Sequence, residues 1–390
     1  MDFTKLTAYL DTLEEKYGVH GLDFKLMKEH KTVYRHMTGH SDYDLTVPVS
    51  ENDLYEVYSC TKIITMTAVM QLIEQKKIGL YDELEKYLPE FSDMQVATDF
   101  KLGEWPFEWP TLDSPLVPAK NKILIHNLMS MTSGLSYDVA SQPIQEKRKQ
   151  AGSKASTREM IKAIARMPLL FEPGTRYSYA LGHDVLAAVV EVASGMTYGE
   201  YLKKNIFEPL AITEMYFHVP ESEKHRISAQ YMRDMKTGEI NPHAGNIFKL
   251  SDAYESGGAG LACTVDDYSM VLDALANNGI GATGARILKP ESILTMSKNW
   301  LTDQQLEDFK KSGKIGYGYG LGVRTLINTS CSKGPIGEFG WDGAAGAYAL
   351  IDPINRMSIF YTHEILGMIT AYSEIHPTIR DLTYEAMNEE

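Results

Sequence analysis

The most apolar helical pattern of the chain lies in residues 58–79. After Cys60, apolar side chains recur at helical spacing, and polar residues gather only at residues 74–77. Gly79 is a typical helix stop. A helix that is apolar around most of its circumference belongs inside a protein. The pattern therefore predicts a buried helix around which the rest of the chain is organised.

Short apolar and alternating runs near both ends of the chain predict strands, each set flanked by a helix. The predicted helices are 3–17 and 371–387, and the predicted strands are 20–27, 32–37, 316–322, 333–341, 345–351 and 357–362. Short connections between consecutive strands indicate an antiparallel sheet. The segment before Ser59 is too short for a complete core, so we expect its strands to join the C-terminal ones. Alternating glycines in residues 316–322 leave one strand face bare, which lets another element pack closely.

The middle of the chain predicts helices and loops. Residues 88–118, rich in Pro and Trp, predict long surface loops. Residues 256–263 form a Gly-rich loop, and Thr264 is a candidate cap for the helix that follows. The predicted helices are 121–131, 157–166, 182–194, 198–207 and 265–277.

These patterns together predict an α+β fold, with a mainly antiparallel sheet flanked by helices and a separate helical lobe. We expect residues 1–58 and 315–390 to form the discontinuous sheet lobe. Residues 59–314 would form the mainly helical lobe, with the active site at the junction of the two.

Composition and charge exclude several classes of protein. The 390 residues, 44% hydrophobic and 23% charged, are typical of a globular chain of one large or two interleaved domains. A net charge of -14 argues against nucleic acid or an acidic membrane surface as partner. Three widely spaced cysteines suggest neither a disulfide framework nor a metal site. The N-terminal segment lacks a secretory signal, and no apolar run is long enough to span a bilayer, so we expect a cytoplasmic protein.

Ser59 and Lys62 are the strongest candidates for chemistry. Their spacing places both side chains on one face of the predicted buried helix. Burial lowers the pKa of a lysine, so Lys62 can accept the Ser59 proton. A Ser-x-x-Lys sequence arises by chance roughly once in a chain of this size. The chain carries such a decoy at residues 330–333, where no helical pattern surrounds it.

Three ordered segments give the pair a context. They read SCTK from Ser59, PGTRYSYALGHDVL around Tyr179, and GWDGAAG around Trp341. They resemble the three motifs of the class C β-lactamase-related serine hydrolases, which share a penicillin-binding-protein-like fold, and most closely those of the family VIII carboxylesterases. Other segments along most of the chain are similar in the same order. The resemblance implies a β-lactamase/transpeptidase-like fold.

The resemblance also implies roles for individual residues. Ser59 would be the acylated nucleophile, Lys62 its base, and Tyr179 a proton relay whose pKa a cationic Lys62 lowers. Tyr177 falls where these esterases carry Trp or Phe, so we expect it to pack. The alternative for Tyr179 is one more buried tyrosine among 23.

The same resemblance implies an oxyanion hole formed by the backbone N–H groups of Ser59 and Ala344. One such donor contributes roughly 3 kcal/mol to lowering a barrier. Gly343 suits a backbone that approaches substrate closely. Trp341 would contact substrate, the alternative being a core Trp at a strand end.

Two departures from the family pattern bear on substrate. Trp341 and Asp342 occupy places where β-lactamases carry Lys and commonly Thr, and Leu181 stands where an Asn amide is usual. We expect Asp342 to repel the carboxylate of a β-lactam. Both changes leave Ser59, Lys62 and Tyr179 intact and favour an esterase.

The sequence therefore predicts a serine hydrolase that acts on small short-chain esters through a Ser59 acyl-enzyme. Alternatives are hydrolysis of β-lactams or D-amino-acid peptides, acyl transfer to an alcohol, and a non-catalytic binding protein. No G-x-S-x-G, H-E-x-x-H or Walker A sequence is present, and the His residues form no metal-ligand cluster. We expect a small-molecule ester or amide as the partner and no cofactor or metal. The oligomeric state stays open.

Overall fold

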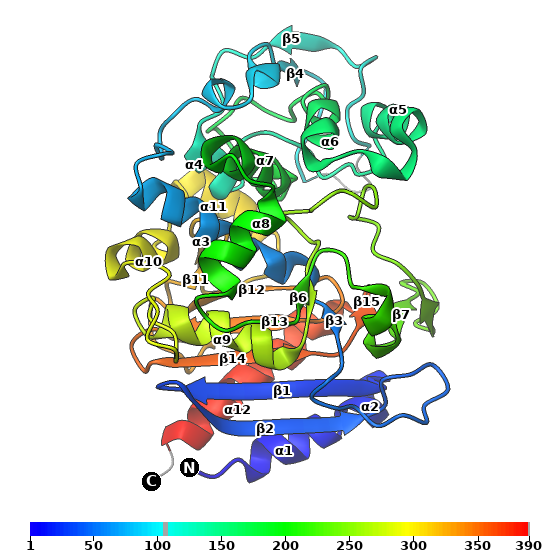
Figure 1. Ribbon diagram of the computed structural model, residues 1–390, viewed down its shortest axis with the longest axis vertical. Coiled ribbons are helices and arrows are strands. Elements are labelled where there is room, and N and C mark those ends of the chain that lie inside the picture. Colours follow the sequence, from blue (N-terminus) through cyan, green and yellow to red (C-terminus); the bar gives the residue numbers. More distant parts are fainter. Residues whose placement is uncertain (104–107, 389–390) are drawn as a thin grey trace.

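The computed structural model describes residues 1–103 and 108–388, which are built on one seven-stranded antiparallel sheet (Figure 1). The strand order is β10-β11-β12-β13-β14-β1-β2. The pairing of β1 with β14 joins the two ends of the chain, as the sequence predicts. The strands are β1 (Gly21–Lys28), β2 (Lys31–Gly39), β10 (Tyr317–Tyr319), β11 (Arg324–Leu326), β12 (Phe339–Asp342), β13 (Tyr348–Asp352) and β14 (Met357–Thr362).

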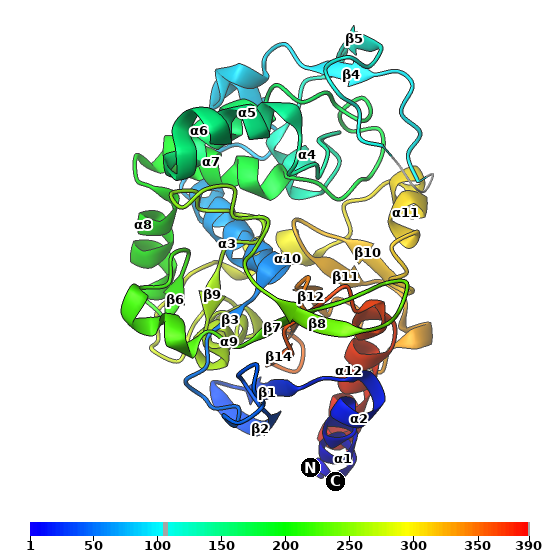
Figure 2. The same cartoon turned by 90° about the vertical axis from the view of Figure 1, so that its right-hand side faces the viewer.

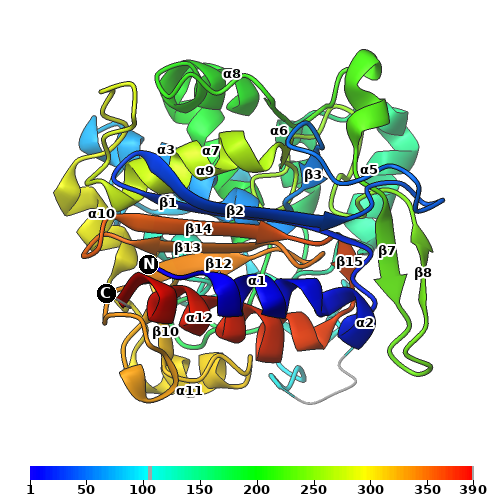
Figure 3. The same cartoon turned by 90° about the horizontal axis from the view of Figure 1, so that it is seen from below.

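Helices cover both faces of this sheet (Figure 3). The terminal helices α1 (Thr4–Asp11), α2 (Leu13–Tyr17) and α12 (His376–Asn388) lie on one face. They bury a core with the sheet that includes Leu10, Phe24 and Ile379. Helix α9 (Val265–Ala276) packs on the opposite face, and the Thr264 hydroxyl accepts a 3.1 Å hydrogen bond from the Asp267 N–H. The expected cap is thereby confirmed.

The predicted buried helix is α3 (Thr61–Glu74), which crosses from the sheet into a group of helices above it (Figure 2). Every residue from Thr61 to Leu72 is buried. The helix carries apolar side chains around most of its circumference, and such a helix packs inside a protein. The surrounding helices are α4 (Ile125–Met129), α5 (Gln142–Ala151), α6 (Thr157–Ile164), α7 (Gly182–Ser194), α8 (Tyr198–Leu202), α10 (Pro290–Ser297) and α11 (Asp303–Lys310).

Short strands that the sequence did not predict tie the loops together. One small sheet joins β3, β9 and β6, a second joins β15, β7 and β8, and a third pairs β4 with β5. Their bounds are β3 (Tyr55–Glu56), β4 (Gln95–Ala97), β5 (Leu116–Pro118), β6 (Met215–Tyr216), β7 (Gln230–Arg233), β8 (Ile240–His243), β9 (Ala262–Cys263) and β15 (Ile365–Leu366). Two- to four-residue strands carry too little periodicity to be recognised.

Several predicted elements are shorter or broken. The predicted helix 3–17 divides at Thr12, whose hydroxyl donates to the Tyr9 carbonyl at 2.7 Å. The predicted strand 333–341 begins only at Phe339, and β11 was missed. The predicted closing helix starts with a π-turn, Ala371–Ile375. The predicted loops of 88–118 contain β4 and β5, and residues 104–107 of that prediction lie outside the described residues.

The glycine face of the predicted strand 316–322 allows another segment to pack closely, and this prediction is confirmed. A Cβ added to Gly318 would lie 2.5 Å from Asn299 Oδ1, so the segment after α10 packs directly on the backbone. Within residues 1–103 and 108–388, no helix has the length and apolar character needed to cross a membrane.

Candidate active site

Ser59 lies on a tight turn that leads into α3. The turn, Tyr58–Cys60, is a 3-10 helix, and Tyr58 has a positive φ of 43°. That conformation costs an L-residue about 1–2 kcal/mol. The Tyr58 hydroxyl donates to Gln230 Oε1 at 2.8 Å, which helps to hold the strained residue in place. The Ser59 side chain is thus presented to a cavity by a fixed backbone.

Lys62 shares a face of the helix with Ser59, as its spacing predicts. Its Nζ donates to Ser59 Oγ at 3.2 Å and to the Gly258 carbonyl at 2.7 Å. The side chain is fully buried. Burial lowers the pKa of Lys62 to about 7. A substantial fraction of the amine is therefore neutral near pH 7 and can accept a proton from the hydroxyl beside it.

Asp184 positions the Gly-rich loop that holds Lys62. Its Oδ1 accepts hydrogen bonds from the Tyr254 hydroxyl at 2.8 Å, the Ser256 hydroxyl at 2.6 Å and the Gly258 N–H at 3.3 Å. A Cβ on Gly258 would clash with the Asp184 carboxylate and lie 3.4 Å from Lys62 Nζ. Glycine therefore lets the carboxylate approach the amine, and this negative charge partly opposes the lowering of the Lys62 pKa by burial.

Tyr179 is held by Trp341. The Trp341 Nε1–H donates to the Tyr179 hydroxyl oxygen at 3.0 Å, and the two rings stack with centroids 5.5 Å apart. Lys62 Nζ lies 4.7 Å from the centre of the Tyr179 ring. Trp341 is therefore more than a core residue at a strand end. Because its indole donates to the oxygen of Tyr179, the Tyr179 proton stays free to be donated elsewhere.

The expected lowering of the Tyr179 pKa is wrong. Burial raises the pKa of Tyr179 well above its usual value, by more than its interactions with Ser59 and Trp341 lower it. The same burial makes Lys62 a weaker cation, so the positive charge that was to stabilise a tyrosinate is reduced. Tyr179 is a neutral phenol, suited to donate a proton. Tyr177 packs edge-on against Phe309 and Tyr319, as expected.

Tyr137 belongs to the site and was not predicted. Its ring lies 5.3 Å from that of Tyr179 and 5.3 Å from that of Phe248, and Lys62 Nζ lies 5.5 Å from its centre. The segment around Tyr137 carries no pattern that separates it from the other tyrosines of the chain. We call Ser59, Lys62, Tyr137 and Tyr179 the catalytic wall of the cavity.

The turn between β12 and β13 lies against the Ser59 turn. A Cβ on Gly343 would lie 2.5 Å from the Val57 carbonyl oxygen, so only glycine allows this approach. The Tyr372 hydroxyl contacts the carbonyls of Gly343 and Ala344 at 3.0 and 3.1 Å. Within the described parts of the chain, the Ala344 N–H donates to no protein atom. Ser59 and Ala344 line one cavity, which suits the predicted pair of oxyanion donors.

Asp342 does not present an uncompensated negative charge, contrary to expectation. It forms an ion pair with Lys314, and its Oδ1 lies 3.5 Å from Arg324 Nη1 and 3.2 Å from His376 Nδ1. Burial alone would raise the pKa of Asp342, but Lys314 and Arg324 hold it well below its usual range. The repulsion expected for a substrate carboxylate is therefore balanced by two cations. We call Lys314, Arg324, Asp342 and His376 the charged wall.

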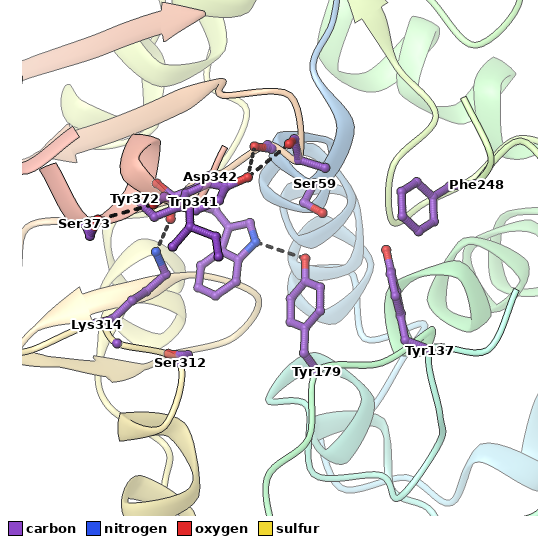
Figure 4. A pocket seen from close by; sticks show the side chains of 14 residues that line it. Ser59, Tyr137, Tyr179, Phe248, Ser312, Lys314, Trp341, Asp342, Tyr372 and Ser373 are labelled. Carbon is purple, nitrogen blue, oxygen red and sulfur yellow. Dashed lines mark hydrogen bonds and ion pairs between the residues drawn. The ribbon is translucent and has the colours of Figure 1, made fainter. Parts of the chain in front are cut away.

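The cavity between these walls has a volume of about 370 Å³ (Figure 4). Aromatic rings dominate its lining, with Tyr137, Tyr179, Phe248, Trp341 and Tyr372 among them. The structure thus brings together Ser59, Lys62, Tyr179, Trp341, Asp342, Gly343 and Ala344.

Leu181 is the predicted site residue that the structure places elsewhere. It is buried in the core at the start of α7, and its N–H donates to the Ser136 carbonyl at 3.2 Å. Among the described residues, no group of three or more His, Cys, Asp or Glu side chains is arranged to hold a metal ion.

Comparison with known proteins agrees with this geometry. Lovastatin esterase from Penicillium rubens is 29% identical over 333 residues, covering 80% of this chain and 79% of that protein. The solved structure of EstCE1, a hydrolase with promiscuous acyltransferase activity, has a TM-score of 0.78, 21% identity and 98% coverage of both chains. A family VIII carboxylesterase structure has a TM-score of 0.74 and 19% identity, covering 98% of this chain and 97% of that one. These two structures confirm the fold.

A family model also matches the chain. The family described as Beta-lactamase matches residues 6–381, nearly the entire chain. The three motifs, the seven strands of the antiparallel sheet and the Ser59–Lys62 pair all lie within that match. The chain therefore belongs to the Beta-lactamase family.

Proposed function

We propose that this protein is a serine hydrolase that cleaves small carboxylic esters with short acyl chains through a Ser59 acyl-enzyme. The observation that carries the proposal is the 3.2 Å contact between Lys62 Nζ and Ser59 Oγ beside the cavity. A buried lysine whose pKa is lowered to about 7 is matched to the work of a general base near neutral pH.

Acylation begins when Ser59 Oγ attacks the ester carbonyl carbon and passes its proton to Lys62 Nζ. The oxyanion that forms is stabilised by the N–H groups of Ser59 and Ala344. As the intermediate collapses, the bond to the alcohol breaks and Tyr179 donates its proton to the departing oxygen. The tyrosinate then recovers a proton from the Lys62 ammonium, whose Nζ lies 4.7 Å from the ring centre.

Deacylation uses the same base. Lys62, again neutral, takes a proton from a water molecule as its oxygen attacks the acyl carbon. Ser59 Oγ leaves and recovers that proton from Lys62, which releases the carboxylic acid. Lys62 and Tyr179 end each half of the cycle with the protons they began with, and the proton that Ser59 loses in acylation is replaced by one from water in deacylation.

The test combines covalent labelling with turnover. Wild type and Ser59→Ala are exposed to a fluorophosphonate and measured by intact mass, with p-nitrophenyl acetate and butyrate turnover in parallel. We expect one adduct and turnover of both esters in wild type, and neither in Ser59→Ala. A wild-type protein that takes no adduct and cleaves neither ester would overturn the proposal.

A second candidate is acyl transfer to an alcohol. The aromatic lining of the cavity favours it, because apolar walls disfavour water relative to an apolar acceptor. If an added alcohol raises the rate of p-nitrophenol release and the new ester forms in larger amount than the free acid, transfer exceeds hydrolysis. Because Asp342 is paired, β-lactam hydrolysis also needs a direct assay with a chromogenic cephalosporin.

A further inference from the structure

A second cavity lies on the other side of the charged wall. It has a volume of about 260 Å³ and reaches toward α12. The two cavities share lining residues, which are Gly313, Lys314, Asp342, Tyr372 and Ser373. The boundary between them therefore consists of a few side chains and not of a layer of core.

The Lys314–Asp342 ion pair stands at this boundary. Figure 4 shows Lys314 reaching to Asp342 on the side of the cavity away from Ser59 and Tyr179. Lys314 Nζ also lies 5.4 Å from the centre of the Trp341 ring and 5.7 Å from that of Tyr372. These contacts place the lysine side chain across the passage from one cavity to the other.

Lys314 lies on a short link that leads into the sheet. Residues 311–316 connect α11 to β10, and Gly313 and Gly316 both have positive φ values, 78° and 83°. These two glycines permit the turns that bring Lys314 back over Trp341. Its side chain is 17% exposed and that of Asp342 only 7%. The ion pair is therefore largely shielded from water, and replacing it requires a group that fills the same space.

The second cavity suits an apolar group more than a charged one. Its cationic side chains already have protein partners. Arg380 donates to the Tyr317 hydroxyl and the Cys331 carbonyl, and Arg324 donates to the Ala349 carbonyl. The remaining lining includes Ile315, Tyr317, Tyr348, Tyr372 and Pro377. A long alkyl or aryl group would contact these rings and leave the hydrogen bonds of Arg324 and Arg380 intact.

We propose that Lys314 is a specificity-determining residue, whose ion pair with Asp342 divides one long substrate cleft and confines the substrate to short ester groups. The second cavity is the site for the distal part of a longer alkyl or aryl ester once this pair is opened. This inference rests on the proposed esterase function and names the side chain that limits its substrate class.

The test compares a short and a long substrate in matched variants. We would measure kcat/KM for p-nitrophenyl acetate and octanoate, and for ethyl and octyl acetate, with wild type, Lys314→Ala and Lys314→Met. Lys310→Ala is the control, because it removes an exposed lysine that pairs with Glu307 on the preceding helix. The two series separate the acyl half of the ester from the alcohol half.

We expect Lys314→Ala to raise the ratio of kcat/KM for the long ester to kcat/KM for the short ester by about tenfold or more in one series. A single methylene in an apolar pocket can give discrimination of that size. Lys314→Met, which keeps the length and loses the charge, should raise the ratio less, and Lys310→Ala should leave it unchanged. An unchanged ratio in both series for Lys314→Ala would overturn the proposal.

A binding measurement keeps this result separate from the esterase proposal. Quenching of tryptophan fluorescence by p-nitrophenyl octanoate would be followed in Ser59→Ala and in Ser59→Ala with Lys314→Ala. The account predicts tighter octanoate binding in the double variant, and no such change with the acetate. Equal affinities would contradict the divided cleft even if wild type proves to be an active esterase.

Discussion

The two walls of the cavity bury lysines in opposite ways. On the catalytic wall, Lys62 is fully buried and contacts a hydroxyl and a carbonyl, with Asp184 held behind Gly258. On the charged wall, Lys314 makes a direct ion pair with Asp342. Burial without a directly paired carboxylate lowers the pKa of Lys62 to about 7, whereas Lys314 holds the pKa of Asp342 well below its usual range.

In the reaction that we propose, the catalytic wall supplies the base and the charged wall limits the substrate. An amine becomes a base at neutral pH when its charged form is destabilised and its partners are neutral. An amine paired with a carboxylate keeps its proton, because the pair stabilises both charges. The Asp184 carboxylate beside Gly258 opposes the lowering of the Lys62 pKa only in part, so burial prevails.

The largest expected effect comes from making the same substitution on each wall. Lys62→Met should lower kcat by about 10²–10⁴, the usual contribution of a general base. Lys314→Met should lower it far less, because Lys314 moves no proton in the proposed reaction. Turnover of p-nitrophenyl acetate measures both, and Lys310→Met is the exposed control. An equal fall in kcat for Lys62→Met and Lys314→Met would contradict the assignment of the base to the catalytic wall alone.

The next effect is on stability. Asp342→Ala leaves Lys314 and Arg324 without their shared carboxylate and should lower the free energy of unfolding by about 3 kcal/mol. Adding Lys314→Met should restore part of that loss, since one unpaired cation is removed. Urea denaturation of the two single variants and the double variant measures the coupling. Strictly additive changes would mean that the pair contributes nothing.

A smaller effect is expected for the hydrogen bond that orients Tyr179. Trp341→Phe keeps an aromatic ring but removes the Nε1–H donor, so the Tyr179 hydroxyl loses its 3.0 Å partner. One neutral hydrogen bond corresponds to about a five- to tenfold change. The kcat for ethyl acetate, whose departing alkoxide needs a proton, should fall by that factor. Tyr179→Phe should lose more, because it removes the proton itself. If both variants match wild type, Tyr179 is not the acid.

The smallest effect is a shift of the pH profile. The Asp184 carboxylate raises the pKa of Lys62 against the lowering by burial, so Asp184→Asn should lower that pKa further. Because the neutral amine is the active form, the acidic limb of kcat/KM should move to lower pH. Glu191→Gln changes another carboxylate on α7 and should leave the limb in place. A shift to higher pH in Asp184→Asn would contradict the assignment.

The parts of the molecule that follow from local pattern were predicted well. The apolar α3 follows from helical periodicity, and the contact between Ser59 and Lys62 follows from their spacing on that helix. The joining of both chain ends in one sheet follows from a first segment that is too short to form a core by itself. Helix α7 and strand β14 have the predicted bounds, since a long apolar run or a short buried strand between turns is unambiguous.

The charge compensation of Asp342 and the pKa of Tyr179 depend on residues that only the fold brings together. Asp342 meets Lys314 and His376, which lie 28 and 34 positions away along the chain. No spacing rule links such positions, so its charge compensation was missed. The direction of the Tyr179 pKa shift was wrong because burial of the phenol raises its pKa by more than the neighbouring groups lower it, a balance that no motif shows.

The central claim is that neutral Lys62 activates Ser59, and the pH dependence of Ser59 labelling tests it most directly. The rate of fluorophosphonate addition would be followed by intact mass between about pH 5 and pH 9 in wild type and Lys62→Met. We expect a wild-type rate that rises through a pKa of about 7 and then levels, and a slow rate without that transition in Lys62→Met. A wild-type rate that does not change with pH, or one equal to that of Lys62→Met, would contradict it.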